Sequence, residues 1–455
     1  MPLIRTSIGP RHFIFLSLAV AIAFFSLAGP LNADALAKLK SDRLEAVRKA
    51  ILALKSQRQD IARRGPYKEF RANLHVHSSL SHDSRGTIEE IVAAAKAVGT
   101  QILMFTEHPS ERYDYFKDGH RGMRDGVLLI PGAETNGFLV YPIQSMRGLD
   151  SKSPQEFADL ARNRGGLVFL SHLEERMDWD IRGLTGTEIY NIHADFKDEK
   201  NLIAAMRNPL WIFKTVDLFR KYPQEAFSTL QDYPADYLRR WDQLCERSPH
   251  TGVAANDAHQ NTGLSIRLLD SDKLRVEDAL GEKLLELDAG ALPILQPLRK
   301  GKKAGDVLFK IQLDPYECSL RHVGTHLLLT ELSESAVREA LENGRAFVAF
   351  DWIADATGFD FAAISPSRRY EMGSRVSLEK PLTLRVQAPL PAKWKLVRDG
   401  KVESESFGRS AEFAVDKPGN YRVEAWLTVA GEEMIWILSN PIYVKQRFRR
   451  ADGGI

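Results

Sequence analysis

Seven side chains of the kinds that bind metal ions follow short apolar, β-branched segments of this 455-residue chain. They are His75, His77, His108, Glu134, His172, Asp257 and His259. Imidazole and carboxylate ligands together suit Zn, Mn or Fe. One exposed histidine alone means little, but this many at the same place on successive strand–helix units is what a centre with several metal ions requires.

The pair His75 and His77 lies where the first expected strand ends. Side chains two residues apart on a strand share a face, so both imidazoles can reach one cation. Such a pair alone is also consistent with a polar turn. In barrels of parallel strands, the groups that do chemistry gather at the carboxyl ends of the strands. The shared position of all seven residues therefore favours a metal centre.

The chemistry expected of such a centre is hydrolysis. Two metal ions about 3.5–4 Å apart hold the attacking and leaving oxygens of a displacement and lower the pKa of water toward neutrality. The sequence contains no Ser-His-Asp or Cys-His arrangement of recognisable spacing. We therefore expect activated water to attack a phosphoryl or acyl centre, without a covalent enzyme intermediate.

The elements that must position these residues alternate between strand and helix from Phe70 onward. The expected strands are 70–74, 102–105, 127–130, 167–170, 188–190 and 252–255. Helices are expected at 87–98, 153–165 and, as a Leu- and aromatic-rich segment, 199–247. Thr87 and Glu90 form a capping-box signature, and Gly99 is typical of a helix end. This alternation predicts an α/β domain with a parallel sheet over residues 67–365.

The chain on either side of this region has a different pattern. Residues 36–66 are expected to form a charged amphipathic helix and linker, which either lies on the main domain or forms a short coiled coil. Residues 366–446 are expected to form a small antiparallel β-sandwich. Its strands are expected at 382–387, 394–398, 411–415, 421–427 and 434–438. Residues 447–455 are a basic tail.

The first 35 residues have the features of a secretory signal peptide. Arg5 and Arg11 precede an apolar run over 13–28, and Ala33-Asp34-Ala35 fits a cleavage site. The apolar run is shorter than the roughly 20 residues that a membrane-spanning helix needs. We expect cleavage before Leu36 and export to the periplasm or the outside of the cell. An uncleaved N-terminal anchor is the alternative.

The composition is ordinary for a soluble globular protein, with 44% hydrophobic and 27% charged residues. The net charge of +2 shows no electrostatic footprint for nucleic acid, so no nucleic-acid partner is expected. Cys245 and Cys318 either pair in a disulfide or remain separate thiols.

Taken together, the motifs resemble those of the PHP (polymerase and histidinol phosphatase) metallohydrolases. The matching motifs are His75-Val-His77-Ser, Thr106-Glu107-His108, Pro131-Gly132-Ala-Glu134, Leu170-Ser-His172 and Asp257-Ala-His259. The likeness covers roughly residues 70–360. It implies a distorted (β/α)7 barrel, here followed by the all-β sandwich. It also implies two or three divalent metal ions, Zn, Mn or Fe, and usually the hydrolysis of phosphoesters.

By this resemblance all seven residues named above are metal ligands. The family's remaining ligand follows the first motif at a variable offset, so His82 and Asp83 compete for that role. We favour Asp83, because it precedes the polar turn that leads into the capped helix. Glu107 stands where the family usually has Asp. Members with three metal ions usually have a histidine between the third and fourth motifs, which this chain lacks, so two ions are the safer expectation. His193 can substitute for it or only line the pocket.

The resemblance leads us to expect catalytic roles for His108, Glu134 and Asp257. We further expect Arg112, Arg121 and His193 to contact the substrate. The loop 111–124 is rich in cations that can hold a phosphate, with Arg as the bidentate partner. A solvated charged loop is the alternative.

The leading functional hypothesis is an exported metal-dependent phosphoesterase that acts on a small-molecule, phosphorylated ester. One alternative is hydrolysis of a carboxylic or carbamic ester or an amide at the same centre. An amidohydrolase barrel also begins with His-x-His, but it normally has a metal-bridging Lys. A further alternative is a degenerate metal-binding barrel whose sandwich contacts envelope components or glycan. The complete ligand set argues against that last reading.

Overall fold

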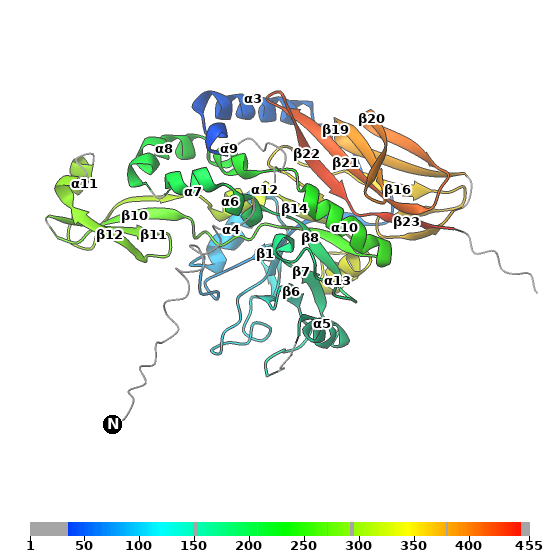
Figure 1. Cartoon of the computed structure of the whole chain (residues 1–455), viewed down its shortest axis with the longest axis horizontal. Coiled ribbons are helices and arrows are strands. Elements are labelled where there is room, and N and C mark those ends of the chain that lie inside the picture. Colours follow the sequence, from blue (N-terminus) through cyan, green and yellow to red (C-terminus); the bar gives the residue numbers. More distant parts are fainter. Residues whose placement is uncertain are drawn as a thin grey trace, which may run out of the picture.

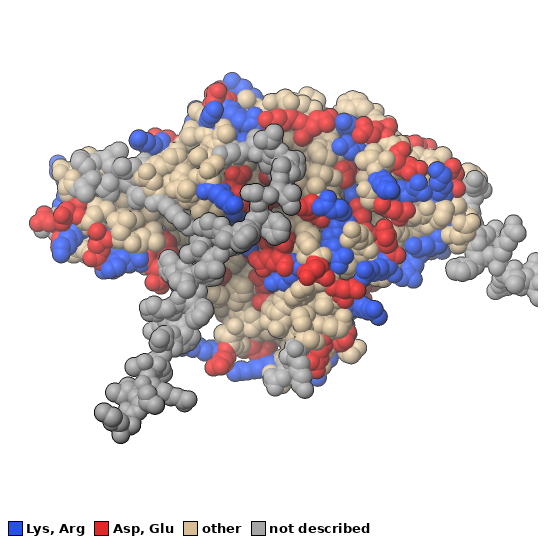
Figure 2. All heavy atoms as spheres, viewed as in Figure 1, with Lys and Arg blue, Asp and Glu red and all other residues tan. Residues whose placement is uncertain are grey.

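The computed structural model describes residues 35–148, 153–206, 208–270, 272–291, 295–378 and 381–446. Residues 1–34 of the expected signal peptide and the basic tail lie outside these described residues. Within the described ranges, none of the helices combines the length and the apolar character needed to cross a membrane. Positive and negative side chains are interspersed over the face drawn in Figure 2.

The candidate ligands lie at or beyond the ends of strands in two sheets, whose strands β1, β7 and β8 are labelled in Figure 1. In the larger sheet, β1 (Lys68–Val76), β2 (Ile102–Phe105) and β4 (Val127–Ile130) run parallel. In the smaller sheet, β7 (Leu167–Leu170), β8 (Gly186–Asn191) and β9 (Thr251–Ala255) run parallel. Its remaining strands are β5 (Ala133–Thr135) and β6 (Phe138–Tyr141), which form an antiparallel hairpin. The order of the smaller sheet is β5-β6-β7-β8-β9.

A closed (β/α)7 barrel, as expected from the sequence, is not confirmed. In the described part of the chain the β-pairing between the two sheets consists of single bridges, Val76 to Ala258 and Glu107 to Ala133. Two features prevent closure. The edge of β1 over residues 68–72 pairs with the antiparallel strand β14 (Gly324–Leu329) instead of β9. The β5–β6 hairpin also interrupts the parallel order of the strands.

The helices that lead into the site follow local rules. In α4 (Ile88–Val98), Thr87 and Glu90 form the capping box, and Gly99 ends the helix with a φ of 79°. In α5 (Pro154–Asn163), the Ser153 side chain accepts from the Glu156 N–H. These helices and the fully buried β2 and β4 agree with the expectations from the sequence.

The β-rich C-terminal part continues the larger sheet. Strand β15 (Ala346–Ala349) pairs with β22 (Glu432–Ser439), which pairs with β21 (Gly419–Val429). The neighbouring strands are β16 (Asp360–Ile364), β17 (Arg369–Glu371), β18 (Arg375–Ser377), β19 (Leu382–Arg398), β20 (Lys401–Val415) and β23 (Ile442–Lys445). The two strands expected at 382–387 and 394–398 are the ends of β19, whose register with β20 breaks between them. The sheet therefore runs without interruption across the predicted domain boundary at residue 366.

A four-stranded antiparallel sheet follows directly after Asp257 and His259, and the sequence analysis did not anticipate it. Its strands are β10 (Gly263–Leu268), β11 (Lys273–Asp278), β12 (Lys283–Asp288) and β13 (Val307–Gln312), in the order β12-β11-β10-β13. It forms one end of the molecule in Figure 1. Helices α7 (Lys200–Met206) and α8 (Pro209–Lys221) contribute Met206 and Phe219 to its apolar cluster.

The remaining helices cover the core. Helix α3 (Ser41–Gln57) buries Leu44 and Val47, and its Arg48 forms two hydrogen bonds of 2.7 Å with Glu225 on α9 (Pro223–Phe227). It follows α2 (Ala35–Lys38). The other helices are α6 (Ile192–Asp198), α10 (Ala235–Arg247), α11 (Gln296–Arg299), α12 (Tyr316–His322) and α13 (Glu334–Glu342). Cys245 and Cys318 are both buried free thiols, so they do not form the disulfide that the sequence left open.

A buried ionic network links β1 and β14 to the segment that follows β15. His326 lies between two carboxylates, with Nδ1 2.6 Å from Glu69 Oε1 and Nε2 2.8 Å from Asp351 Oδ2. Arg71 Nη2 lies 2.6 Å from the same Asp351 oxygen. Burial lowers the pKa of His326, but the carboxylates of Asp351 and Glu69 outweigh burial and raise it to about 9.

This network predicts a loss of stability at alkaline pH. Unfolded histidine titrates near pH 6.5, so the stabilisation from His326 is complete below that pH and is lost as the pH rises through about 9. We expect the Tm to fall between about pH 6 and pH 9, and His326→Gln to remove most of that fall. The matched control is His322→Gln, since burial holds the pKa of His322 at about 3 and it stays neutral at both pH values. An unchanged pH dependence in the His326 variant would contradict a charged imidazole at this position.

Candidate metal centre

The carboxyl ends of β1 and β9 bring four candidate ligands together. His75 and His77 come from β1 and the residue just beyond it, while Asp257 and His259 follow β9. The His77 N–H donates to the Ala258 carbonyl (3.0 Å), and the Ala258 N–H donates to the His75 carbonyl (3.2 Å). These backbone bonds hold the two segments side by side, so residues about 180 positions apart in the sequence face the same centre.

The first group of ligand atoms, site A, consists of His75, His77, Glu134 and Asp257, whose ligand atoms all lie within 4.8 Å of one another. His75 Nε2 is 3.3 Å from both Glu134 Oε2 and Asp257 Oδ1. His77 Nε2 is 3.7 Å from the same two oxygens. Two imidazole nitrogens and two carboxylate oxygens therefore surround one position.

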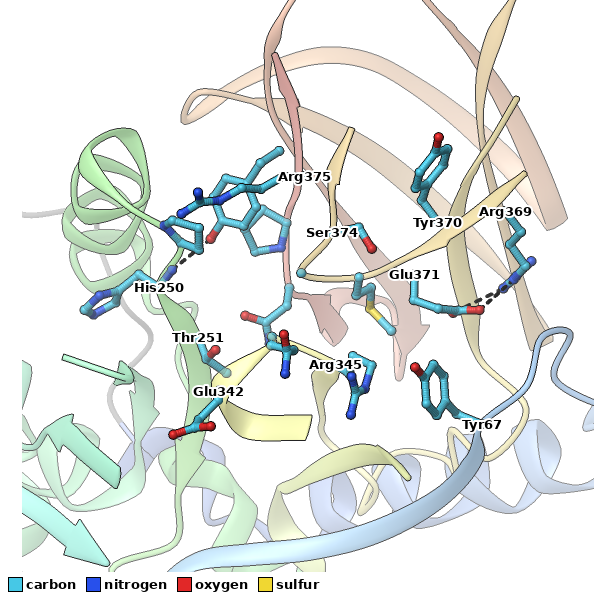
Figure 3. Close-up of a pocket in the computed structure, with 18 of the residues that line it drawn as sticks. Tyr67, His250, Thr251, Glu342, Arg345, Arg369, Tyr370, Glu371, Ser374 and Arg375 are labelled. Atoms are coloured by element: carbon cyan, nitrogen blue, oxygen red, sulfur yellow. Dashed lines mark hydrogen bonds and ion pairs between the residues drawn. The ribbon is translucent and has the colours of Figure 1, made fainter. Parts of the chain in front are cut away.

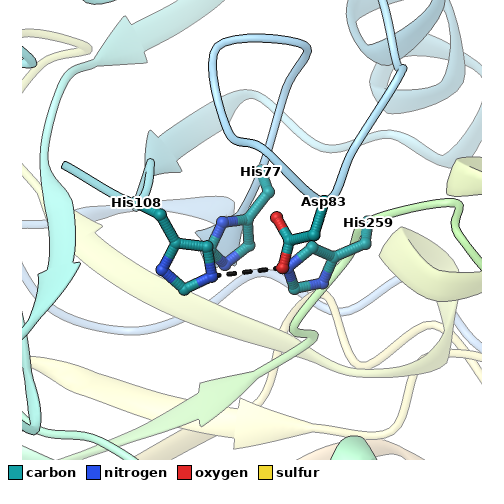
Figure 4. Close-up of side chains that lie close together, drawn as sticks. All are labelled: His77, Asp83, His108 and His259. Atoms are coloured by element: carbon teal, nitrogen blue, oxygen red, sulfur yellow. Dashed lines mark ion pairs between the residues drawn. The ribbon is translucent and has the colours of Figure 1, made fainter. Parts of the chain in front are cut away.

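The second group, site B, consists of His77, Asp83, His108 and His259, which converge in Figure 4. Asp83 Oδ2 lies 3.2 Å from His259 Nε2 and 3.3 Å from His108 Nε2. His82 is exposed and does not belong to the group, although its ring centroid lies 5.0 Å from that of His108. Of the two competing residues, the structure brings Asp83 to the centre.

A third position, site C, lies between His172, His193 and the outer oxygens of Glu134 and Asp257. His172 Nε2 is 2.9 Å from Glu134 Oε1 and 3.5 Å from Asp257 Oδ2. His193 Nδ1 is 2.8 Å from Asp257 Oδ2. His193 lies in the first turn of α6, where the Asn191 side chain accepts from its N–H. The histidine whose role the sequence left open therefore reaches the centre.

Two of these residues have a backbone conformation that L-amino acids rarely adopt. The φ angles of His172 and Asp257 are 44° and 45°. Each of them lies two residues beyond the end of its strand, β7 or β9. Positive φ persists only where the surroundings determine it, and it is concentrated at functional sites.

Glu188 on β8 supports both sites A and C, and the sequence analysis missed it. Its Oε1 lies 2.7 Å from His75 Nδ1, and its Oε2 accepts from the His172 N–H (2.8 Å) and from Asn191 Nδ2 (3.2 Å). A carboxylate on Nδ1 leaves Nε2 of His75 facing the centre, the usual arrangement for a metal-binding histidine. Glu188 is fully buried within a β-strand, where an acidic residue is rare unless it is paired. The signal in the sequence was an acidic residue beside the apolar residues Ile189 and Tyr190 of an expected strand.

The other histidines have similar partners. His77 Nδ1 lies 3.1 Å from Ser81 Oγ, which donates to Glu107 Oε2 (2.8 Å). Glu107, which stands in place of the family's Asp, also accepts from the Ser78 N–H and thus anchors the loop after β1. His172 Nδ1 lies 3.1 Å from Glu174 Oε1. Ser81 and Glu174 are thus positioning residues that the motif pattern did not identify, and Glu107, noted in the sequence only as a departure from the family pattern, is a third.

The charge distribution fits bound cations. Burial raises the pKa of a carboxyl, but the neighbouring imidazoles outweigh burial and hold the pKa values of Glu134 and Asp257 well below the usual range. Oδ1 of Asp257, Oδ1 of Asp83 and Nε2 of His259 are buried and make no hydrogen bond within the described chain. Buried polar atoms without a hydrogen bond are costly, and cations at sites A and B would give these three residues a charged partner. The donor set is one that suits Zn, Mn or Fe.

The structure does not bring the two arginines expected to bind substrate into this centre. Arg121 Nη1 lies 3.2 Å from Glu334 Oε2, and its guanidinium lies 4.4 Å from the centre of the Phe116 ring. Arg112 is exposed. Another cation of the same loop, Arg124, pairs with Glu89.

Comparison with known protein families agrees with this geometry. Residues 73–218 match the family model described as the PHP domain. The chain contains a PHP domain. The matched range holds the first four motifs and His193, whereas Asp257 and His259 lie beyond it. A PHP domain with these His, Asp and Glu clusters fits a centre for more than one metal ion.

The other comparisons add little. No curated protein matches the chain. A solved structure from Bacteroides vulgatus ATCC 8482, a two-domain protein containing a predicted PHP-like metal-dependent phosphoesterase, is 15% identical. The match covers 84% of this chain and 97% of that chain, with a TM-score of 0.34. A likeness at that level supports no statement about the site.

A cleft of about 520 Å³ lies away from the metal centre. Tyr67, His250, Arg345 and Arg375 line it, beside β17 and β18 (Figure 3). His250 precedes the amino end of β9, whereas Asp257 follows its carboxyl end. Since chemistry in parallel α/β folds gathers at the carboxyl ends of strands, this cleft is not the candidate active site.

Replacing Glu188 tests the positioning role directly. Glu188→Gln keeps the size of the side chain but removes the charge and places an amide NH2 against the His75 ring or the His172 N–H. We expect metal affinity to fall by roughly 10- to 100-fold without unfolding the protein. Chelator competition measures the affinity, and the Tm of the same sample reports folding. Glu277→Gln is the matched control, because Glu277 is also buried in a strand but pairs with Arg267 away from the centre. Equal metal affinity in both variants would contradict the role of Glu188.

Proposed function

We propose that the PHP domain is a metal-dependent hydrolase that acts on phosphoric esters of small molecules. The observation that supports this most is the position of two carboxylates between the candidate sites. Glu134 turns Oε2 toward His75 in site A and Oε1 toward His172 in site C. Asp257 turns Oδ1 toward His75 and Oδ2 toward His193. Carboxylates placed in this way can bridge neighbouring cations, which is what multi-metal hydrolysis requires.

The residues that would hold the cations are those of sites A, B and C. Divalent ions bound there supply Lewis acidity, activate water and offset the charge on the ester oxygens. Glu188, Glu174 and Ser81 keep the Nε2 atoms of their histidines aimed at the centre. The side chains of His108 and His193 are 27% and 42% exposed, so they mark the side from which a substrate can enter.

We favour phosphoric esters as the substrates because several cations would offset the anionic charge that repels an attacking nucleophile. The second candidate is hydrolysis of a carboxylic or carbamic ester or an amide at the same centre. One observation favours keeping it: Arg121 is held by Glu334 instead of facing the centre, so the expected guanidinium clamp for phosphate is not formed.

Hydrolysis in 18O-labelled water tests the reaction. The protein is loaded with Mn or Zn and screened against phosphomonoesters, phosphodiesters and carboxylic esters. Under single-turnover conditions the label should enter the product and never the protein, and a chelator should stop a reaction that Mn or Zn then restores. Activity that survives thorough metal removal would overturn the mechanism. Turnover of carboxylic esters alone would remain consistent with the metal centre and would select the second candidate function.

We also propose that the protein is exported. The support is the arginine-flanked apolar run and the Ala33-Asp34-Ala35 segment that follows it. N-terminal sequencing of the exported protein should begin near Leu36. An intact cytosolic form starting at Met1, found as the sole species, would rule export out.

A further inference from the structure

A cavity of about 220 Å³ adjoins the metal centre, and its walls are mostly apolar. Its lining includes His193, Asp257 and His259, which belong to the candidate sites described above. The lining also includes Leu39, Phe196, Leu202, Phe227 and Leu230. The cavity thus combines candidate metal ligands with mostly apolar walls.

The apolar walls are built into the core of the protein. Leu39, Leu202, Phe227 and Leu230 are each at most 8% exposed, and all four belong to the largest apolar cluster of the molecule. Leu39 follows α2, Leu202 lies on α7, Phe227 ends α9 and Leu230 lies in the adjoining 3-10 turn Ser228–Leu230. The walls therefore come from segments as far apart in the sequence as α2 and α9. A space bounded by packed side chains from several elements keeps its shape better than a gap beneath one loop.

Apart from the candidate metal ligands, Asn256 and Asp314 are polar residues of the lining that already have partners. The Asn256 side chain donates to the carbonyls of Ser319 and Val323. The Asp314 carboxylate accepts from the N–H groups of Asn261 and Thr262. A polar group placed deep in the cavity would therefore lose its contacts with water without gaining new ones, which is unfavourable.

The size of the cavity limits what can fill it. An apolar cavity of about 150 Å³ holds a benzene ring. The cavity described here is somewhat larger, so it accommodates an aryl ring or an alkyl chain of about six carbons. A strongly hydrated group such as a sugar would lose its hydrogen bonds with water against the apolar walls, which is unfavourable.

We infer that the substrate is an ester with an aryl or short alkyl group that fills this cavity while the ester group lies at the candidate metal ligands. The inference rests on the proposed hydrolytic function, and it adds the class of substrate. Each buried methylene contributes about three- to fourfold in affinity. The five additional methylenes of a hexyl group should therefore raise affinity over a methyl group by on the order of several hundred-fold.

The test uses two non-hydrolysable probes, hexylphosphonate and methylphosphonate, with the full-length protein loaded with Mn or Zn. Titration calorimetry should show hexylphosphonate binding on the order of several hundred-fold more tightly than methylphosphonate. Met206→Trp, which fills the cavity from α7, should remove most of that preference while methylphosphonate affinity stays within about twofold. Met434→Trp is the matched control, because Met434 is also partly buried but lies on β22 outside the cavity lining. It should keep the full preference.

Equal affinities for the two probes, or no binding of hexylphosphonate, would overturn the inference. An equal loss of both affinities in Met206→Trp would do the same. If that variant fails to fold, Phe196→Asp places a charge in the same wall and should reduce hexylphosphonate binding selectively. Hydrolysis of esters without an alkyl preference would overturn this inference alone. An alkyl preference in a protein that hydrolyses none of the screened esters would overturn the hydrolase proposal and leave the cavity assignment in place.

Discussion

Asp257→Asn is expected to lose at least one metal ion per chain and to lose nearly all turnover. The Asp257 side chain is 1% exposed, and its two oxygens face different ligands: Oδ1 lies 3.3 Å from His75 Nε2, and Oδ2 lies 2.8 Å from His193 Nδ1. Asparagine keeps the shape but replaces one anionic oxygen with an amide that donates. The loss of activity should exceed the roughly 100-fold effect of removing an outer hydrogen-bond partner of a metal ligand.

Metal content after dialysis, measured by mass spectrometry, and the turnover of an ester substrate check this result together. The control is Asp42→Asn, which makes the same chemical change at an exposed position on α3. Wild-type metal content in the Asp257 variant would remove Asp257 from the candidate ligands. Lost turnover with full metal content would instead assign it a role in catalysis without binding.

The parts of the fold that could be predicted are those determined by neighbouring residues. Strands β2 and β4 lie at the predicted residues, because each is a short apolar run that is buried on both faces. Helix α4 begins and ends at its predicted caps, since capping requires only residues within one turn. His77, His108, His172 and His259 follow β1, β2, β7 and β9 as expected, whereas His75 lies within β1.

Barrel closure could not be predicted from such local patterns. Whether the edge of β1 pairs with β9 or β14 depends on residues about 250 positions away, and β14 takes most of it. The sheet from β10 to β13 was a different kind of omission. Leu264, Ile266 and Leu268 alternate with polar residues at period two, so the signal was in the sequence and was not used.

The candidate site shows the same difference between features set by neighbouring residues and features set by distant ones. Residues of the family motifs at or just beyond strand ends were found, whereas Glu188 was missed because it belongs to no motif and acts through His75. His193 could be named but not placed, because it lies on a helix and its partner Asp257 is 64 residues away. Arg121 was expected at the substrate, but a carboxylate on the distant helix α13, Glu334, holds it elsewhere.

Asp83→Ala and His82→Ala form a pair of neighbouring substitutions with opposite expected results. Asp83 Oδ2 lies between His108 Nε2 and His259 Nε2, at 3.3 and 3.2 Å, and its other oxygen is buried without a hydrogen bond. Burial raises the pKa of a carboxyl, but the imidazoles of His108 and His259 outweigh it and hold the pKa of Asp83 well below the usual range. These surroundings favour the anionic carboxylate, which is the form that binds a cation.

Asp83→Ala should remove the cation at site B, because two imidazoles and the shared His77 then remain without an anionic ligand. Turnover should fall with it, while the metal ion held by His75, Glu134 and Asp257 at site A is retained. His82→Ala should keep both metal content and turnover, since the His82 side chain is exposed and outside the group. Metal analysis of the two variants after identical dialysis decides between them. If the pattern were reversed, the loop after β1 would have to turn by one residue when metal binds, which would break the Ser84 hydroxyl bond to the His259 carbonyl. That bond ties the loop to the segment carrying Asp257 and His259, so the structure favours Asp83.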